Sequence, residues 1–297
     1  MNKVIAVVVT YNRIELLKEC VKALQQQTYP CDILIVDNAS TDGTEEYINK
    51  VKKNYDNLHY INTGANIGGA GGFNLGMRWA VEVGYEYVWV MDDDCITLKN
   101  TLQELLKAET LVEDKCGFLA SKILWRNKKI CVMNIPRRTM FTQIRDFDSN
   151  LPKITLASFV SLLIPIKVVK KVGLPIKEFF IWTDDWEYTR RISKIYPCYL
   201  VNNSIAIHKS LSNIGANISK DSVDKLNRYY YLYRNDVYLY KREGLKGFMY
   251  EAIRLFVHIF KVILFSKNNK LKRLKYIVKG TADGLNFKPV IEYVDQK

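Results

Sequence analysis

The sequence predicts an α/β fold in which helices cover both faces of a mostly parallel sheet, followed by a basic helical extension. Three observations predict it. Over the first hundred residues, short apolar runs alternate with amphipathic stretches, as in βαβ units. Polar clusters follow the apolar runs, and positive charge gathers toward the C-terminus. We expect an α/β domain at residues 1–235 and an amphipathic, basic helical region at residues 236–297.

The apolar runs have the length and composition of buried strands. Residues 4–9 are a continuous run rich in valine, which is typical of a strand that is covered on both faces. The remaining strands of this half are expected at residues 32–36, 58–61 and 87–91. Helical patterns separate them at residues 14–27, 44–53 and 68–83. Residues 115–210 are less regular, with a helix at about 184–194, and the chain is Tyr-rich and helical from about residue 227.

Charge and cysteine usage narrow the classes of partner and compartment. The chain has 297 residues, with 44 Lys or Arg against 31 Asp or Glu, so its net charge of +13 predicts an anionic partner. Between Lys241 and Lys279 there are eleven basic residues and two glutamates, so we expect the anionic partner to bind mainly at the C-terminal region. Six cysteines without a C-x-x-C pair favour reduced thiols over disulfides or a zinc site.

The C-terminal region also contains an amphipathic pattern. In residues 248–265 the polar side chains recur at spacings of three, four and three, at Glu251, Arg254, His258 and Lys261. They draw one narrow polar stripe on an apolar helix, and basic residues follow. The pattern fits a helix lying on anionic lipid, with packing against the rest of the chain or another subunit as the alternative. Nucleic acid is disfavoured, because the basic run lacks a recognised binding module.

The N-terminus and the hydropathy pattern lead to an expectation about location. We find no signal-peptide pattern and no apolar stretch of the roughly 20 residues that a spanning helix needs. We therefore expect a cytoplasmic protein, peripheral at the inner face of the cell membrane.

Three consecutive aspartates follow the fourth predicted strand. Adjacent carboxylates repel one another unless a cation neutralises them. If the strand continued, Asp92 and Asp94 would point the same way and could reach one ion. Oxygen ligands suit Mg²⁺ or Mn²⁺, which keep open positions for phosphate oxygens. The alternative is an acidic turn that caps the next helix.

Two further segments are candidates for the same edge of the sheet. Residues 66–72 place four glycines in five positions before a helix, where backbone N–H groups could approach phosphate, although this signal alone is weak. Residues 182–188 place three carboxylates among tryptophans at a helix start. Asp184 could simply be the N-cap, whereas a desolvated Asp185 would be a good general base. His208 ends a strand-like stretch and could add an imidazole ligand, although a lone histidine is usually only a satisfied polar residue.

Together these motifs resemble the family 2 glycosyltransferases of GT-A fold. The segments 9–13, 36–43 and 66–72 look like that family's nucleotide-binding elements, and residues 92–94 look like its metal-binding signature. More narrowly, residues 91–94, residues 182–188 and His208 are similar to those of galactofuranosyltransferases that use UDP-galactofuranose. The resemblance covers about residues 3–235. One departure is Thr183, which separates Trp182 from the paired aspartates, so that Trp186 could take the acceptor-stacking place.

The resemblance implies an inverting, metal-dependent transfer of a sugar from a nucleotide diphosphate to a lipid-linked or glycan acceptor. Asp185 would be the general base. The metal, Mn²⁺ or Mg²⁺, would be held by Asp92, Asp94 and His208. The donor would be bound by Thr10, Asn12, Arg13, Asp37, Asn66, Gly69, Asp92 and Asp93. A dTDP-rhamnose-dependent rhamnosyltransferase and a non-catalytic sugar-nucleotide-binding module are the alternatives, and a homo-oligomer remains open.

Overall fold

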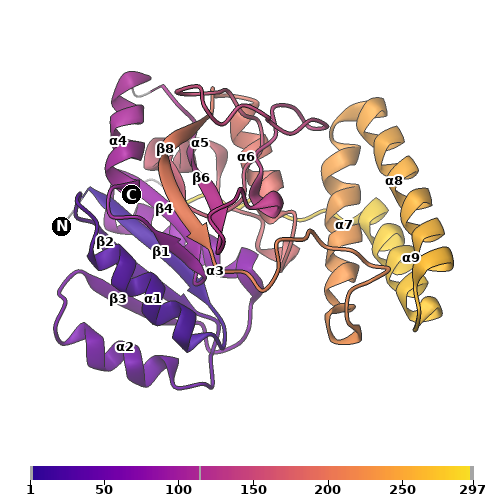
Figure 1. The fold of residues 1–297 in the computed structure, drawn as a ribbon, viewed down its shortest axis with the longest axis horizontal. Coiled ribbons are helices and arrows are strands. Elements are labelled where there is room, and N and C mark those ends of the chain that lie inside the picture. The colour runs from indigo at the N-terminus through magenta and orange to yellow at the C-terminus, as the bar shows by residue number, and fades with distance from the viewer. Residues whose placement is uncertain (1–2, 114, 295–297) are drawn as a thin grey trace.

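The computed structural model describes residues 3–113 and 115–294. Helices cover both faces of one sheet, and a group of three helices stands beside this layered body at the C-terminal end of the chain (Figure 1). The strands are β1 Val4–Thr10, β2 Asp32–Asp37, β3 Leu58–Asn62, β4 Tyr87–Asp92, β5 Cys95–Thr97, β6 Leu119–Trp125, β7 Leu162–Pro165 and β8 Tyr199–His208. The α-helices are α1 Ile14–Gln25, α2 Thr44–Lys52, α3 Gly68–Val83, α4 Thr101–Leu111, α5 Ile166–Val172, α6 Asp184–Ser193, α7 Arg228–Lys241, α8 Gly244–Phe265 and α9 Lys270–Asn286. Short 3₁₀ helices are η1 Val132–Asn134, η2 Lys177–Phe179 and η3 Val223–Lys225.

The strands form one sheet in the order β3-β2-β1-β4-β7-β6-β8-β5. From β3 to β4 all neighbours are parallel, as the alternation of apolar and amphipathic segments predicts. The second half is mixed, because β7 is antiparallel to β4 and β6, while β6 and β8 are parallel and β5 is antiparallel to β8. The prediction of a mostly parallel sheet therefore describes the first four strands and misses the mixed character of the rest.

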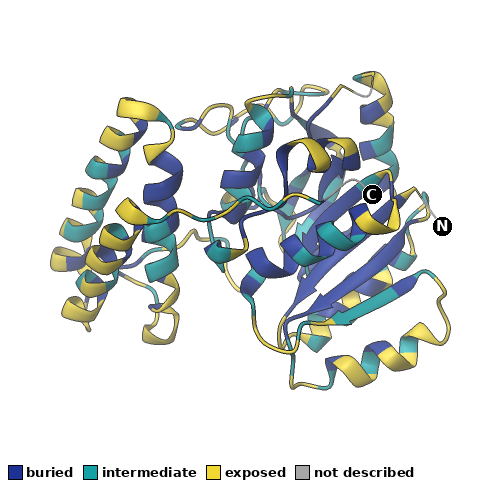
Figure 2. Ribbon diagram, turned by 180° about the vertical axis from the view of Figure 1, so that it is seen from behind, coloured by how far each residue is buried: buried dark blue, intermediate teal, exposed yellow. Residues whose placement is uncertain are grey.

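The alternation of side chains along β1 explains why this strand is apolar throughout. Every second residue from Ile5 belongs to the core that α3 covers, and the intervening residues from Val4 belong to the core that α1 covers. All seven residues of β1 are buried. Figure 2 shows the burial continuing through the neighbouring strands. A strand with two dry faces needs apolar residues at every position.

The sheet has to curl, because two strands that are neighbours along the chain lie far apart in its order. β4 and β5 are separated by β7, β6 and β8, which amounts to about 19 Å in a flat sheet. Only Asp93 and Asp94 connect β4 to β5, and three steps along the chain span at most about 11 Å. The far edge of the sheet therefore bends back toward the end of β4, which brings β8 and β5 to the carboxyl ends of the parallel strands.

The C-terminal helices α7, α8 and α9 share a core of their own, which includes Tyr229, Tyr233, Val262 and Ile277. The predicted boundary between residues 235 and 236 falls inside α7, so the chain passes from the α/β body into the helical group without a break in the helix. The division into two domains stays a prediction.

Helix α8 turns three of its four stripe residues, Glu251, Arg254 and His258, toward the protein, whereas Lys261 is exposed. Glu251 is 4% exposed and makes two hydrogen bonds of 2.7 Å with Arg254, and His258 Nδ1 lies 2.9 Å from the Tyr233 hydroxyl on α7. Many of its apolar side chains point outward, with Phe256 66% and Phe260 62% exposed, whereas Leu255, Ile259 and Val262 pack in the helical core. Figure 2 shows this exposed face along α8.

Two expectations about the whole chain have structural answers. Among the described residues there is no helix with the length and hydropathy needed to cross a bilayer. The six cysteines are all free and buried, which confirms the prediction that they form no disulfides.

Candidate active site

The chain that leaves β4 folds into a turn and carries its aspartates to the curled part of the sheet. Thr10 at the end of β1 donates a 2.8 Å hydrogen bond to Asp93 Oδ2. Arg13 Nη1 lies 3.1 Å from Asp93 Oδ1 and 2.8 Å from Asp94 Oδ2. Both carboxylates are almost fully buried, while the Arg13 side chain is 46% exposed. Thr10, Arg13 and Asp93 thus belong to one network that ties the end of β1 to the acidic turn.

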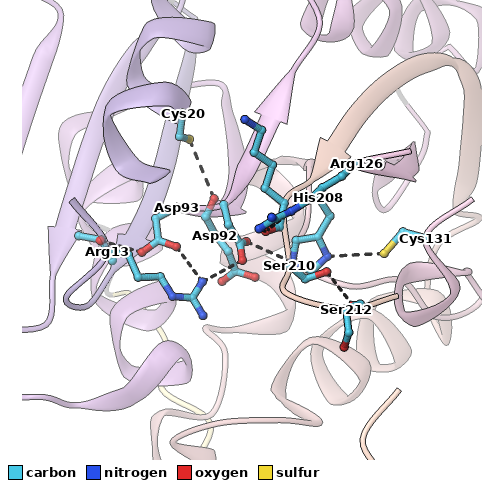
Figure 3. A network of polar contacts seen from close by, with 12 residues as sticks. Arg13, Cys20, Asp92, Asp93, Arg126, Cys131, His208, Ser210 and Ser212 are labelled. Carbon is cyan, nitrogen blue, oxygen red and sulfur yellow. Dashed lines mark hydrogen bonds and ion pairs between the residues drawn. The ribbon is translucent and has the colours of Figure 1, made fainter. Parts of the chain in front are cut away.

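His208 reaches the same turn from the last position of β8. It is paired in register with Cys95 at the start of β5, and the backbone N–H of Lys209 donates to the Asp94 carbonyl at 2.8 Å. These contacts bring His208 Nε2 to 3.1 Å from Asp94 Oδ1. In Figure 3 Arg13 approaches the aspartates from one side and His208 from the other. The structure therefore brings together a carboxylate and an imidazole that are 114 positions apart in the sequence.

The surroundings of His208 suit a metal ligand. Its Nδ1 lies 2.7 Å from Asn134 Oδ1, which can only accept, so Nδ1 carries the proton and a neutral ring would turn its Nε2 lone pair toward Asp94. Asp94 Oδ1 accepts no well-aligned hydrogen bond from the described residues. Two ligands at right angles on one Mg²⁺ are each about 2.1 Å from the ion and therefore about 3 Å from each other. Asp94 Oδ1 and His208 Nε2 have this separation.

Asp92 does not complete a cage around that position. The described residues contain no group of three or more Asp, Glu, His or Cys side chains arranged to hold an ion. The reason is local, because β4 ends at Asp92 and residues 93 and 94 form the turn toward β5. The alternation expected of a continuing strand is therefore wrong beyond Asp92. The alternative of an acidic helix cap is wrong as well, because β5 and not a helix follows.

Electrostatics show that the acidic turn holds excess negative charge. Burial and the charge of Asp94 raise the pKa of Asp92 to about 7. Burial raises the pKa of Asp93 to about 6 despite the neighbouring Arg13 guanidinium. Burial lowers the pKa of His208, but contact with Asp94 outweighs it and raises that pKa to about 10. Without a bound cation, an imidazolium and a guanidinium share the neutralisation of the three carboxylates.

The loops after β1 and β2 are held together by their own polar groups. Asn12 Oδ1 accepts a 2.7 Å hydrogen bond from the Thr41 N–H. Asp37 is fully buried and accepts hydrogen bonds from the Tyr60 hydroxyl at 2.8 Å and the Ser40 N–H at 2.9 Å. Asp37 and Asn12 therefore shape these loops in this structure, and their contact with a nucleoside stays a prediction.

The glycine-rich segment is the first turn of α3, and most of its glycines serve packing. A Cβ at Gly72 would lie 2.6 Å from Val9 Cγ1, so this glycine lets α3 pack closely on β1. Gly68 has φ 77°, and a Cβ there would meet the Phe180 carbonyl oxygen at 2.1 Å. A Cβ at Gly69 would meet nothing within 4 Å. Asn66 is exposed and accepts from the Gly68 N–H at 2.9 Å. Asn66 and Gly69 are the positions of this segment that remain open to a ligand.

Asp185 lies in the first turn of α6, near enough to the acidic turn for the charge of Asp92 to act on it. Burial raises its pKa well above the usual value, and the charges of Asp184 and Asp92 raise it further, while the Trp186 N–H donates to its Oδ1 at 2.7 Å. Asp184 is not the N-cap, because Thr183 occupies that position. Glu187 pairs with Arg191 at 2.7 Å and is structural. Burial also raises the pKa of Asp184, to about 6, but of these two aspartates it is Asp185 whose pKa the charge of Asp92 raises as well, which makes Asp185 the better candidate for a base.

The two tryptophans beside this helix differ in their surroundings. The Trp182 ring packs edge-on against Tyr229, whereas the Arg137 guanidinium lies 4.0 Å above the Trp186 ring. An acceptor that stacks on Trp186 would share that ring with Arg137.

Sequence comparison assigns this arrangement to a family. The sequence profile described as glycosyl transferase family 2 matches residues 5–157, which include β1 to β4 and the acidic turn. The chain belongs to this family. It is 25% identical to the galactofuranosyltransferase GlfT1 of Mycolicibacterium smegmatis, over 82% of this chain and 84% of that protein. It is 24% identical to the dTDP-rhamnosyl transferase RfbF of Shigella flexneri, over 96% of each. This glycosyltransferase thus resembles galactofuranosyltransferases, as the motifs predicted.

Solved structures confirm the GT-A fold. The structure of S. aureus TarS matches with a TM-score of 0.57 and 16% identity, covering 97% of this chain and 44% of the TarS chain. For TarS 1–349 in complex with UDP the TM-score is also 0.57, with 72% of that chain covered. Both matches cover 97% of this chain, so they include most of the C-terminal helices as well as the α/β body.

Asn134 is the site residue that sequence reasoning missed. It lies in η1, within the irregular middle of the chain, and its Nδ2 also donates to Ser158 Oγ at 2.8 Å. No periodicity or motif marks it, since an isolated asparagine in a loop is usually a turn residue. It reaches His208 because β6 pairs with β8, which sets Trp125 beside His208, and the chain after β6 folds back along that strand.

Proposed function

We propose that this glycosyltransferase moves galactofuranose from UDP-galactofuranose to a hydroxyl group of a lipid-linked or polysaccharide acceptor, with inversion at the anomeric carbon. The observation that carries the proposal is the 3.1 Å approach of Asp94 Oδ1 and His208 Nε2, near enough to Asp92 to affect its pKa, as Asp92 in turn affects that of Asp185. In this proposal the diphosphate of the donor binds at Asp94 and His208, and the base, Asp185, acts close to it.

Asp94 and His208, with Asp92 beside them, would hold Mn²⁺ or Mg²⁺. Such an ion neutralises the charge that develops on the departing diphosphate. Two or three protein ligands suit this task, since these ions keep several positions for phosphate oxygens and water. Asn134 would fix the ring of His208 through Nδ1. Arg13 is half-exposed and already bonded to Asp93 and Asp94, so it would contact the diphosphate at the same place.

Asp185 would accept the proton of the acceptor hydroxyl. As that oxygen forms its bond to the anomeric carbon, the bond from that carbon to the diphosphate oxygen breaks, and UDP leaves with the electron pair. A single displacement inverts the configuration. Replacing Asp185 with Asn should leave donor binding intact and lower turnover by about 10² to 10⁴, the usual contribution of a general base. Near-normal turnover of this variant in steady-state assays would exclude Asp185 from the role.

The donor sugar is best tested by nucleotide release. The similarity to GlfT1 over most of both chains favours UDP-galactofuranose. The similarity to RfbF over 96% of both chains makes dTDP-rhamnose the alternative. We expect UDP release from UDP-galactofuranose with Mn²⁺ and a lipid-linked acceptor, and none from the His208→Ala variant. Release from dTDP-rhamnose alone would establish the alternative. Donor binding without release from any sugar nucleotide would indicate a non-catalytic binding module.

The exposed face of α8 supports a location at a membrane surface. Its apolar side chains surround a groove of about 410 Å³ that is lined by Ile253, Phe256, Val257, Phe260, Lys261, Leu264 and Phe265. Exposed lysines continue along α9 and the turn before it, at Lys267, Lys270, Lys272, Lys275 and Lys279. An apolar face with lysines beside it suits the boundary of an anionic bilayer. A lipid-linked acceptor would then be presented from the same surface.

Vesicle binding tests this location. The Phe256→Glu/Phe260→Glu variant should lose most of its binding to phosphatidylglycerol-containing vesicles in flotation assays. The control Leu111→Glu should not, since Leu111 is 66% exposed on α4, outside the C-terminal helices. Equal vesicle binding by all forms would contradict the proposal. It would also be contradicted if the parent protein were a dimer that the double variant dissociates, because a second copy of the chain would then cover this face.

A further inference from the structure

The segment that leads into α6 has a strained backbone. Phe180, Trp182 and Thr183 have φ values of 63°, 65° and 67°, so three of four consecutive residues have a positive φ without being glycine. Each is unfavourable for a residue with a Cβ, and such residues persist only where the surroundings impose them. Asp185 follows two residues later. The strain therefore lies immediately before the proposed base.

One turn of α7 imposes this conformation. Asn235 is fully buried, and its Nδ2 donates to the carbonyl oxygens of Phe179 and Trp182 at 2.9 Å each and of Ile181 at 3.3 Å. Its Oδ1 accepts from the Arg234 guanidinium at 2.9 and 3.0 Å, which leaves the amide only one orientation. One side chain therefore binds three carbonyl groups of a segment more than fifty residues earlier in the chain.

The next residue of α7 fixes the end of the segment. The Thr183 hydroxyl donates a 2.6 Å hydrogen bond to Asp236 Oδ1. The Arg254 guanidinium on α8 lies 2.6 Å from the other carboxylate oxygen, Asp236 Oδ2. Thr183 is the N-cap of α6, yet its side chain makes no capping bond to that helix. The hydroxyl is thus used to anchor α6 to α7 and not to satisfy its first turn.

The segment also contacts the start of α3. The Ala70 N–H donates to the Phe180 carbonyl at 3.2 Å, beside the open position at Gly69. The same four residues therefore lie between the proposed donor-binding turn and the proposed base.

We propose that Asn235, Asp236 and Thr183 are positioning residues of sugar transfer, which hold Asp185 at the angle and distance that the acceptor hydroxyl requires. The inference rests on the proposed role of Asp185. The helical group consequently contributes to the active site through α7 as well as presenting the apolar face of α8. A displacement of about 1 Å at a reacting group can cost a factor of 10² in rate, so a small relaxation of this segment would be measurable.

Substitutions at Thr183 separate positioning from stability. Thr183→Val removes the hydroxyl with little change in volume. Thr183→Gly removes it too, but glycine adopts positive φ without strain, which offsets part of the stability lost with the hydrogen bond to Asp236. We expect both to lower kcat by about 10- to 100-fold with donor affinity within about twofold of the parent in calorimetry. Thr183→Ser should restore kcat to within about threefold. Ser266→Ala, which also removes a buried hydroxyl hydrogen bond within the helical group, should leave kcat unchanged.

A double-mutant cycle distinguishes this inference from the proposed function. If Thr183 acts through Asp185, adding Thr183→Gly to Asp185→Asn should lower kcat no further. If Asp185→Asn is slow while Thr183→Gly keeps the parent kcat, the positioning inference is overturned and the base assignment stands. If Asp185→Asn retains the parent turnover, the proposed function itself is overturned. An unrestored Thr183→Ser variant, or full additivity in the cycle, would also refute the inference.

Discussion

The packing of α3 on β1 gives a prediction that separates a glycine needed for packing from the glycine that we propose contacts the donor. In a Gly72→Ala variant the new methyl group would lie 2.6 Å from Val9 Cγ1 and 3.0 Å from Val9 Cγ2. Carbon atoms in contact are normally about 3.5–4.0 Å apart, so α3 would have to shift by about 1 Å. Overpacking of this kind costs about 1–3 kcal/mol, and the better helix propensity of alanine returns about 1 kcal/mol. We expect a net loss of about 1 kcal/mol.

Gly69→Ala is the matched control on the same helix. Its new methyl group would meet nothing within 4 Å, so the variant should gain up to about 1 kcal/mol of stability from helix propensity. If Gly69 faces the donor, this same variant should bind UDP-sugar more weakly. Urea unfolding and donor calorimetry on both variants measure the two effects. A Gly72→Ala variant as stable as the parent, or a destabilised Gly69→Ala variant, would refute the packing argument.

Three further predictions concern the acidic turn. Asn134→Ala should weaken Mn²⁺ binding by about 10- to 100-fold in calorimetry, because it frees the ring of His208, and unchanged affinity would show that Asn134 does not orient it. Binding of Mn²⁺ at pH 7 should release about one proton, because the pKa of His208 is raised to about 10 and a ligating imidazole must be neutral; calorimetry in two buffers of different ionisation enthalpy measures this, and no buffer dependence would contradict it. Asp92→Asn should stabilise the metal-free protein. Since the pKa of Asp92 is raised to about 7, the folded parent protein loses stability as the pH rises from about 4 through 7. The stability gained by Asp92→Asn should therefore grow over that range to at most about 4 kcal/mol. Thermal unfolding from pH 4 to 8 measures this gain, and a gain confined to acid pH would exclude this cause.

The first half of the fold follows from local sequence patterns, whereas the second half depends on tertiary pairing. β1, β2 and β4 are buried on both faces or nearly so, which makes their apolar runs easy to recognise, and β3 at the edge is partly buried. β7 has four residues and β6 contains a register shift after Ser121, so neither has a periodicity that identifies its neighbours. The mixed pairing of this half could therefore not be predicted from composition.

The site shows the same division. His208 and Asp94 were predicted to meet, and the pairing of β5 with β8 brings them together. The alternation argument for Asp92 and Asp94 was wrong because strand geometry does not continue through the turn. For α8 the sequence pattern predicted the polar stripe, but it could not show which residues of the stripe face α7. Arg254 and His258 find their partners on α7, and such long-range pairs leave no periodic signal in the sequence.

The two-residue connection between β4 and β5 has a consequence for how this chain can vary. Asp93 and Asp94 bridge the opening of a curled sheet, so the number of residues in the bridge sets how tightly the sheet closes. One extra residue would let the edge strands open outward and would carry Asp94 away from His208. A loop at the opposite end of the strands, such as residues 53–57 between α2 and β3, carries no such constraint, unlike the connection between β4 and β5. That connection has a fixed length, because a single pair of residues determines both the curvature of the sheet and the distance between the two groups proposed to share an ion.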